Sequence, residues 1–117
     1  MATTVLIVDD HDAFRTRARR MLEADGYEVV GEAVDGAAGL DAARRLVPDV
    51  VLLDLQLPDT SGFAVASELA GAPSAPAVVI TSTRDDTDFE SMAQRSGARG
   101  FLSKADLSGP ALERLLG

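Results

Sequence analysis

Short apolar runs alternate with longer amphipathic stretches along the whole chain. The runs are four to seven residues long and rich in Val, Leu and Ile, which predicts strands, the most apolar of them buried on both faces. In the stretches between them, apolar residues recur at three- and four-residue spacing, which predicts helices. The predicted strands span residues 5–8, 28–34, 50–53, 77–81 and 99–102, and the predicted helices span about 14–24, 36–47, 62–70, 89–96 and 108–116.

The apolar face of each predicted helix indicates which residues pack on the sheet. The second helix is expected to face inward through Leu40, Ala43 and Val47 before Pro48 stops it. In the last helix Ser108 is expected to act as N-cap and Pro110 to lie in the first turn. The inward residues expected elsewhere are Phe14, Ala18, Met21 and Leu22 in the first helix, Phe63, Ala66 and Leu69 or Ala70 in the third, Phe89, Met92, Ala93 and Ser96 in the fourth, and Leu112, Leu115 and Leu116 in the fifth.

Strict alternation of five strands with five helices favours an α/β fold. Each strand would lie parallel to the next, with a helix crossing over between them, so helices would cover both faces of the sheet. For five strands in a chain of 117 residues we expect a flavodoxin-like sheet of order 2-1-3-4-5. The length predicts one domain over residues 1–117, with no second domain in this chain.

Composition narrows the function classes. The net charge is -8, which argues against direct binding of nucleic acid because phosphate contacts need a basic surface. There is no cysteine, so disulfides and thiolate metal sites are excluded. The N-terminus has no signal-peptide pattern, and no apolar run approaches the roughly 20 residues that span a bilayer. We therefore expect a cytoplasmic protein without membrane contact.

Polar residues stand where four of the predicted strands end. In a doubly wound sheet, binding sites lie beyond the carboxyl ends of the strands, so these residues should meet at one edge. Three carboxylates gathered there would repel one another unless a cation intervened. Ligands that are all oxygen favour Mg²⁺. The residues concerned are Asp9 and Asp10 after the first strand, Asp54 at the end of the third, Ser82 after the fourth, and Lys104 after the fifth.

Such a site suits a phosphoryl group. The carboxylate of Asp54 can attack phosphorus, while Mg²⁺ and the ammonium group of Lys104 neutralise the equatorial oxygens and Ser82 donates to one of them. Lys104 is the only lysine among eleven basic residues, although a bias toward arginine across the genome would explain this equally well.

The chain resembles the receiver domains of response regulators, including the CheY-like proteins, over essentially its whole length. The resemblance is carried by the segments VLIVDD, LLDLQLPDTSG and GARGFLSK and by the hydroxyl after the fourth strand. The Asp-Asp-His start and Lys-Ala-Asp near the end are similar to the receivers of LuxR- and NarL-type transcription regulators. One departure is Ala105, where the family often has proline after the lysine.

The resemblance implies a role for each site residue. It makes Asp54 the phosphoacceptor and Lys104 the phosphate-binding lysine. It implies a Mg²⁺ site in which Asp10 and Asp54 bind directly, Asp9 binds through water, and Gln56 contributes its backbone carbonyl. It also implies that Ser82 and Phe101 form the conformational switch and that Gln56 and Arg84 tune the lifetime of the phosphoryl group.

The resemblance further implies a two-component signalling protein rather than an enzyme with a separate substrate. The phosphoryl donor would be a sensor histidine kinase or a histidine phosphotransfer protein. Two outputs are compatible with it: control of a partner protein, and a phosphorylation-dependent homodimer. Phosphorylation would act by shifting an existing conformational equilibrium.

Two other classes of function compete with this prediction. One is a constitutive interaction module that no longer uses phosphorylation. The other is an enzyme, either a flavodoxin or a Toprim-like domain, but the residues after the predicted first and third strands lack the motifs those folds require. Among single residues, His11 and Asp59 are expected to be a solvated helix-start residue and a loop residue. The run Arg15, Arg17, Arg19 and Arg20 is expected to be a solvated face or a docking surface for an acidic partner.

Overall fold

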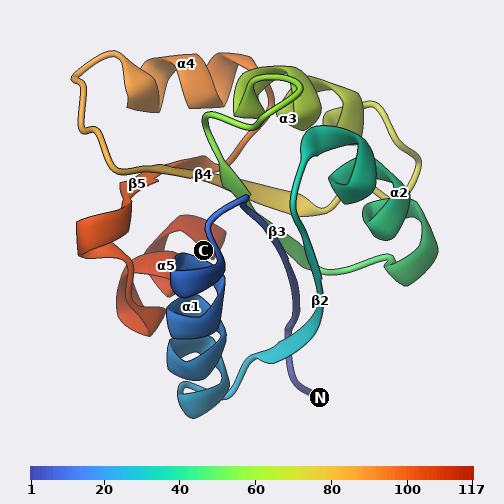
Figure 1. Ribbon diagram of the computed structural model, residues 1–117, viewed down its shortest axis with the longest axis vertical. Coiled ribbons are helices and arrows are strands. Elements are labelled where there is room, and N and C mark those ends of the chain that lie inside the picture. The colour runs from blue at the N-terminus through green and yellow to red at the C-terminus, as the bar shows by residue number, and fades with distance from the viewer.

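A computed structural model describes residues 1–117. It has a central five-stranded sheet, five α-helices and one 3₁₀ turn (Figure 1). The strands are β1 (Thr4–Val8), β2 (Glu28–Ala33), β3 (Val50–Asp54), β4 (Ala77–Ser82) and β5 (Gly100–Ser103). The helices are α1 (Asp12–Ala24), α2 (Gly36–Leu46), α3 (Gly62–Ala70), α4 (Phe89–Arg95) and α5 (Gly109–Leu116), with the 3₁₀ turn η1 (Lys104–Asp106) between β5 and α5.

The sheet is parallel throughout, and its strand order is β2-β1-β3-β4-β5. Both features confirm the fold expected from the alternating pattern. The register aligns Val8, Leu53, Ile80 and Phe101 in one row across four strands. Asp9, which directly follows β1, and Asp54, the last residue of β3, come one position beyond this row, so the sequence changes from apolar to acidic at the same edge of the sheet.

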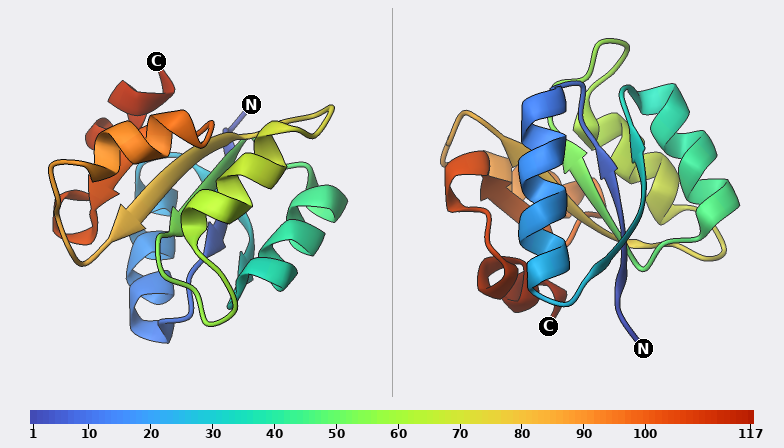
Figure 2. Two further views of the ribbon diagram at one scale, coloured as in Figure 1. Left: turned by 90° about the horizontal axis from the view of Figure 1, so that it is seen from above. Right: turned by 60° about the horizontal axis from the view of Figure 1, so that its bottom comes forward.

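Helices cover both faces of the sheet, as the three views show (Figures 1 and 2). Helices α1 and α5 pack on one face, where they bury Phe14, Ala18, Leu22 and Leu112. Helices α2, α3 and α4 pack on the other face, and the residues buried there include Ala42, Ala43, Val65, Ala66, Leu69 and Ala93. Because β1, β3 and β4 are covered on both sides, their inner residues are nearly all apolar. No helix of the chain is long and apolar enough to cross a membrane.

The predicted cap of the last helix is observed, and α2 has caps that the sequence did not predict. The Ser108 side chain accepts a hydrogen bond from the Ala111 N–H at 3.1 Å, and Pro110 lies in the first turn of α5. Helix α2 has two acidic caps: Asp35 accepts from Ala38, while Asp59 reaches across from the loop before α3. The carboxylate of Asp59 accepts hydrogen bonds from the N–H groups of Gly36 and Ala37 at 2.8 and 3.0 Å.

Two inward positions expected from helical spacing are wrong. Helix α2 ends at Leu46, and Val47 is a left-handed C-cap (φ 46°) that is 56% exposed. The following Pro48 disfavours a right-handed helical conformation at Val47, so the helix ends one residue before its apolar pattern does. Met92 is 38% exposed because α4 is only seven residues long and meets the sheet along a narrow line through Phe89 and Ala93.

Candidate functional site

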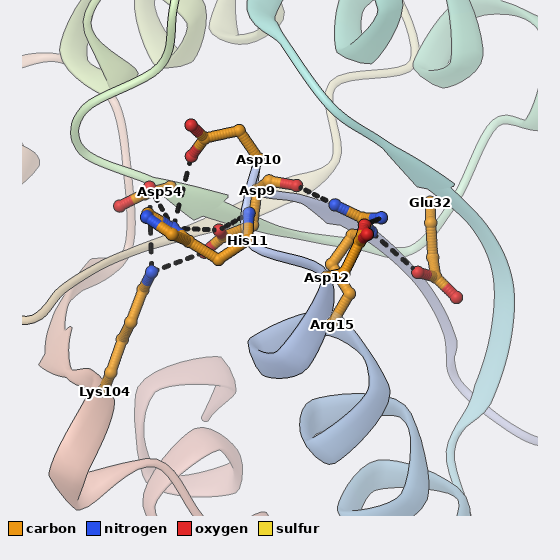
Figure 3. A network of polar contacts seen from close by, with 8 residues as sticks. All are labelled: Asp9, Asp10, His11, Asp12, Arg15, Glu32, Asp54 and Lys104. Atoms are coloured by element: carbon orange, nitrogen blue, oxygen red, sulfur yellow. Dashed lines mark hydrogen bonds and ion pairs between the residues drawn. The ribbon is translucent and has the colours of Figure 1, made fainter.

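Three carboxylates meet beyond the carboxyl ends of β1 and β3. Asp54 is the last residue of β3, and Asp9 directly follows β1, where its N–H donates to the carbonyl of Ala33. Asp9 and Asp54 are buried, at 1% and 4% exposure, whereas the Asp10 side chain is 36% exposed. We call Asp9, Asp10 and Asp54 the acidic cluster; Figure 3 shows its side chains converging. The sequence prediction that the strand ends bring these carboxylates together is therefore borne out by the geometry.

Lys104 reaches the acidic cluster from the end of β5, the edge strand that is separated from β3 by β4. It begins η1, directly after β5, and its Nζ lies 2.7 Å from Oδ2 of Asp9 and 3.7 Å from Oδ2 of Asp54 (Figure 3). Its side chain is only 7% exposed, and the ammonium group lies 4.4 Å from the centre of the Phe14 ring. A buried lysine needs such partners, because burial without a counter-charge disfavours the ammonium form. Lys104 therefore offsets part of the negative charge of the cluster.

His11 also faces the acidic cluster, which its sequence position did not predict. Its side chain is 62% exposed, as expected for a residue at a helix start. Yet Nδ1 lies 2.9 Å from Oδ1 of Asp9, 3.2 Å from Oδ1 of Asp10 and 3.9 Å from Oδ2 of Asp54 (Figure 3). The backbone N–H of His11 donates to the same Asp9 oxygen at 2.9 Å. The ring is thus turned toward the carboxylates rather than into solvent.

Burial and charge repulsion make Asp54 an unusual carboxylate. Desolvation and the neighbouring Asp9 raise its pKa to about 6, against the opposing effects of Lys104, a hydrogen bond from the backbone of Gln56, and His11. At neutral pH the group is still mostly ionised, so it can act as a nucleophile. Its raised pKa also means that a further cation nearby would stabilise the site.

The donor set fits a divalent cation. Asp9, Asp10, His11 and Asp54 each offer one ligand atom, and these atoms all lie within 4.8 Å of one another. Oδ2 of Asp9 is buried and accepts no hydrogen bond of normal geometry, although Lys104 forms an ion pair with it. The ammonium group of Lys104 is the partner that makes burial of this oxygen tolerable. The acidic cluster could therefore bind a metal ion.

None of the remaining predicted site residues bonds to the carboxylates of the cluster through its side chain. Ser82 ends β4, is buried, and accepts a hydrogen bond from the N–H of Arg84 at 3.1 Å. Phe101 lies buried on the face of the sheet covered by α4, its ring centre 5.2 Å from that of Phe89. Arg84 and the side chain of Gln56 are exposed. Only the backbone of Gln56 touches the cluster, through its bond to Asp54.

Part of the arginine run of α1 is held in ion pairs rather than solvated. Nε of Arg15 and Nε of Arg19 donate to the two carboxylate oxygens of Glu32, on β2, at 2.9 and 2.8 Å. Arg15 also donates to the backbone carbonyl of Asp9 at 2.7 Å and pairs with Asp12 (Figure 3). The prediction of a solvated face is therefore wrong for these two arginines. They hold α1 against β2 and brace the loop that carries the acidic cluster.

Comparison with known proteins gives one consistent result. The model of the response regulator receiver domain family matches residues 5–110. The response regulator GacA of Pseudomonas syringae pv. syringae is 41% identical over 102 residues, which cover 86% of this chain and 47% of that protein. The chain spans about half the length of the curated relatives it matches.

Solved structures agree with the sequence comparison. The signal receiver domain of a response regulator named NarL from Mycobacterium tuberculosis superposes with a TM-score of 0.89 at 33% identity, covering 99% of this chain and 98% of that one. The chemotaxis response regulator CheY4 of Vibrio cholerae superposes with a TM-score of 0.87 at 25% identity, covering 98% and 99%. The similarity extends over essentially the whole fold.

Proposed function

The chain belongs to the response regulator receiver domain family of bacterial two-component systems, and on this premise we propose that Asp54 accepts a phosphoryl group. The observation that carries the proposal is the pairing of a buried carboxylate with a buried ammonium group: Asp54 is 4% exposed, and Nζ of Lys104 lies 3.7 Å from its Oδ2. The proposed donor is a phosphohistidine of a sensor kinase or of a phosphotransfer protein.

The proposed reaction is a direct phosphoryl transfer. A carboxylate oxygen of Asp54 forms a bond to phosphorus while the bond between phosphorus and the histidine nitrogen of the donor breaks. The electron pair of the broken bond stays on the donor imidazole, which takes a proton from water. The product is an acyl phosphate on Asp54. Lys104 neutralises phosphoryl oxygens without exchanging a proton, because its role is electrostatic.

The proposed metal is Mg²⁺, held by Asp10 and Asp54 directly, by Asp9 through water and by the backbone carbonyl of Gln56. The three clustered carboxylates support this choice, because oxygen donors are the ligands that Mg²⁺ prefers. When bound, the ion supplies positive charge to the equatorial phosphoryl oxygens. The raised pKa of Asp54 supports it too, because a cation would relieve the repulsion between Asp54 and Asp9.

The conformational switch is proposed to run from Ser82 to Phe101. The Ser82 hydroxyl has one hydrogen bond, from the N–H of Arg84, so its own O–H is free to donate to a phosphoryl oxygen. Phe101 lies on the neighbouring strand, where Ser82 is aligned with Ser103. Movement of Ser82 toward Asp54 would change the space available to Phe101. Gln56 and Arg84, whose side chains are exposed, are proposed to tune how long the phosphoryl group survives.

The output is proposed to be a change of binding surface rather than turnover of a separate substrate. Receiver domains are in general phosphoacceptor switches, and phosphorylation adds about -1.5 to -2 charges at pH 7. That charge stabilises the minor state of an existing equilibrium. The proposed readers of the new surface are a partner protein or a second copy of the chain in a phosphorylation-dependent homodimer.

Intact mass spectrometry tests the phosphoacceptor. With acetyl phosphate and Mg²⁺, the wild-type protein should gain the mass of one phosphoryl group, and Asp54→Asn should gain none. Asp41→Asn is a matched control, because Asp41 is an exposed carboxylate on α2. A phosphoryl adduct on Asp54→Asn would disprove the assignment.

A metal titration tests the cofactor. Mg²⁺ should bind the folded state preferentially and raise the free energy of unfolding of the wild type by about 2.7 kcal/mol at one hundred times the dissociation constant, which raises its melting temperature. The shift should be much smaller in Asp10→Asn and unchanged in Asp41→Asn. Equal shifts in all three proteins would show that Mg²⁺ acts outside the acidic cluster.

A further inference from the structure

The imidazole of His11 points toward the acidic cluster, and neither helix capping nor burial explains this orientation. Nδ1 lies 2.9 Å from Oδ1 of Asp9 and 3.2 Å from Oδ1 of Asp10. His11 is the N-cap of α1, but its side chain makes no capping hydrogen bond, so helix formation does not explain the ring orientation. With 62% of the side chain exposed, burial does not force it toward the cluster either.

Two arrangements explain an imidazole nitrogen this close to carboxylate oxygens. Nδ1 can carry a proton and donate to Asp9. Alternatively, the proton can lie on Nε2, and the lone pair of Nδ1 then faces the carboxylates and would be repelled unless a cation lay between them. Both arrangements use the same positions of the heavy atoms.

The spacing of the donor atoms fits shared coordination. Adjacent ligands of an octahedral ion with bonds of about 2.1 Å are separated by about 3 Å. The distances from Nδ1 of His11 to the Asp9 and Asp10 oxygens, 2.9 and 3.2 Å, match that separation. The distance from Nδ1 to Oδ2 of Asp54, 3.9 Å, lies between the adjacent separation and the opposed separation of about 4.2 Å, so this pair would move slightly to share one ion.

The donor set also indicates which class of ion would bind. Asp9 is 1% exposed; its Oδ1 faces Nδ1 of His11, whereas its Oδ2 is paired with Nζ of Lys104 at 2.7 Å. An acidic cluster of oxygen atoms alone would select Mg²⁺ or Ca²⁺, whereas an imidazole nitrogen is a good ligand for Mn²⁺, Co²⁺, Ni²⁺ and Zn²⁺. The donor set of this chain therefore differs in kind from three carboxylates.

We propose that His11 is a metal ligand in the acidic cluster, so that the site binds divalent first-row transition-metal ions through Nδ1 of His11 together with Asp9, Asp10 and Asp54. The inference rests on the metal site of the proposed function and extends it to a second class of ion. The imidazole raises the affinity for such ions and leaves the affinity for Mg²⁺ governed by the carboxylates.

The sequence provides an unusually clean probe, because His11 is the only histidine and the chain has no cysteine. In a protein without a histidine tag, the two imidazole ¹⁵N signals therefore come from this residue alone. Zn²⁺ should move the Nδ1 signal on titration, and Mg²⁺ should leave both ring signals nearly in place.

Isothermal titration calorimetry then measures the selectivity. His11→Gln should weaken Zn²⁺ binding at least about tenfold relative to Mg²⁺ binding, because it removes the nitrogen ligand and keeps a polar side chain of similar size. Asp10→Asn should weaken the binding of both ions, since it removes a shared oxygen ligand. Asp41→Asn, far from the cluster in sequence and exposed on α2, should change neither.

The outcomes separate this inference from the proposed function. If the ratio of Zn²⁺ to Mg²⁺ affinity is the same in wild type and His11→Gln, or if Zn²⁺ leaves the Nδ1 signal unmoved, the inference is overturned while the phosphoacceptor role of Asp54 stands. Zn²⁺ affinity that is unaffected by Asp10→Asn also overturns it, because the histidine would then be binding the ion alone. Failure of Asp54 to be phosphorylated would instead overturn the proposed function and leave the selectivity result standing.

Discussion

Nζ of Lys104 lies closer to Oδ2 of Asp9, at 2.7 Å, than to any oxygen of Asp54. In this state of the protein the lysine therefore neutralises the carboxylate after β1, and the carboxylate at the end of β3 keeps a raised pKa of about 6. The ammonium group therefore lies near the proposed phosphoacceptor, but its shorter ion pair is with Asp9. A phosphoryl group on Asp54 could attract it by a short movement of a flexible side chain.

Replacing Lys104 tests this balance of charges. Lys104→Met keeps the length of the side chain but removes the cation, which should raise the pKa of Asp54 further and destabilise the protein by about 3 kcal/mol at pH 8. The loss should be smaller at pH 5, where Asp54 can take up a proton. Carbon-13 NMR of the carboxyl groups measures the pKa, and urea denaturation measures the stability. Lys104→Arg keeps the charge and should lose less; equal losses in both variants would point to packing instead.

The raised pKa of Asp54 predicts a pH dependence with a definite sign. Between its ordinary pKa of 3.8 and its folded value of about 6, the folded protein binds more protons than the unfolded chain. Stability from this group is therefore fully present below pH 3.8 and is lost as the pH rises through 6, by about 3 kcal/mol in total.

Asp54→Asn should remove that dependence and should be more stable than the wild type at pH 8 and in EDTA. Urea denaturation of both proteins from pH 4.5 to 8 measures it. The difference between them should grow with pH; two parallel curves would mean that the pKa of Asp54 is not raised. Asp41→Asn should follow the wild type throughout, because Asp41 is exposed.

Glu32 should contribute measurably to stability through its two arginine partners. Burial alone would raise its pKa, but hydrogen bonds from Arg19 and Arg15 outweigh that effect and hold the pKa below its ordinary value. Glu32→Gln should therefore cost about 1 kcal/mol at pH 7, since the group is part of a half-buried network. The cost should shrink as the pH falls through the lowered pKa and Glu32 takes up a proton.

Thermal unfolding at several pH values measures this effect. Glu28→Gln is a matched control on the same strand, exposed and without an ion pair. A loss of the same size in Glu28→Gln would show that general charge balance, rather than the bracing of α1, is responsible. Addition of salt should reduce the effect of Glu32→Gln, because half-exposed ion pairs are screened.

Gly62 should tolerate no side chain. A Cβ atom added there would lie 2.5 Å from the backbone carbonyl oxygen of Asp54 and 3.0 Å from Cα of Leu55, and neither backbone atom can rotate away. Gly62→Ala should cost about 1–3 kcal/mol and shift the NMR signals of Asp54. Gly71→Ala, at the end of the same helix, meets no atom closer than 3.7 Å and should change stability by less than about 0.5 kcal/mol. Similar losses would refute the steric explanation.

The sequence predicted the acidic cluster and Lys104 well because parallel strands end at a common edge. Once Asp9 and Asp54 each follow a buried strand, their proximity follows from the topology. Periodicity predicted less well where local rules compete with it, as at Val47, where Pro48 ends the helix before the apolar pattern stops. Hydrophobic periodicity therefore predicts that a helix is present and which face packs on the sheet, but it does not predict the exact residue at which the helix ends.

Contacts between side chains of different elements were the least predictable part. The pairing of Glu32 with Arg15 and Arg19 depends on the register of β2 against β1, which shifts between Val5 and Leu6. No periodic pattern encodes such a shift. The position of His11 likewise depends on the first turn of α1, and the cap that Asp59 provides for α2 depends on the fold of the loop before α3. The sequence around Asp59 predicted only that it lies in a loop, and not that it caps α2.

Helix α4 buries only one of its residues, Ala93, and Asp88 at its start makes no side-chain capping bond. It touches β5 in two ways: the ring of Phe89 stacks obliquely on that of Phe101, and the carboxylate of Glu90 accepts a hydrogen bond from the Phe101 N–H at 3.0 Å. Because both a ring contact and a backbone hydrogen bond link α4 to Phe101, any displacement of β5 at that residue would be transmitted directly to α4.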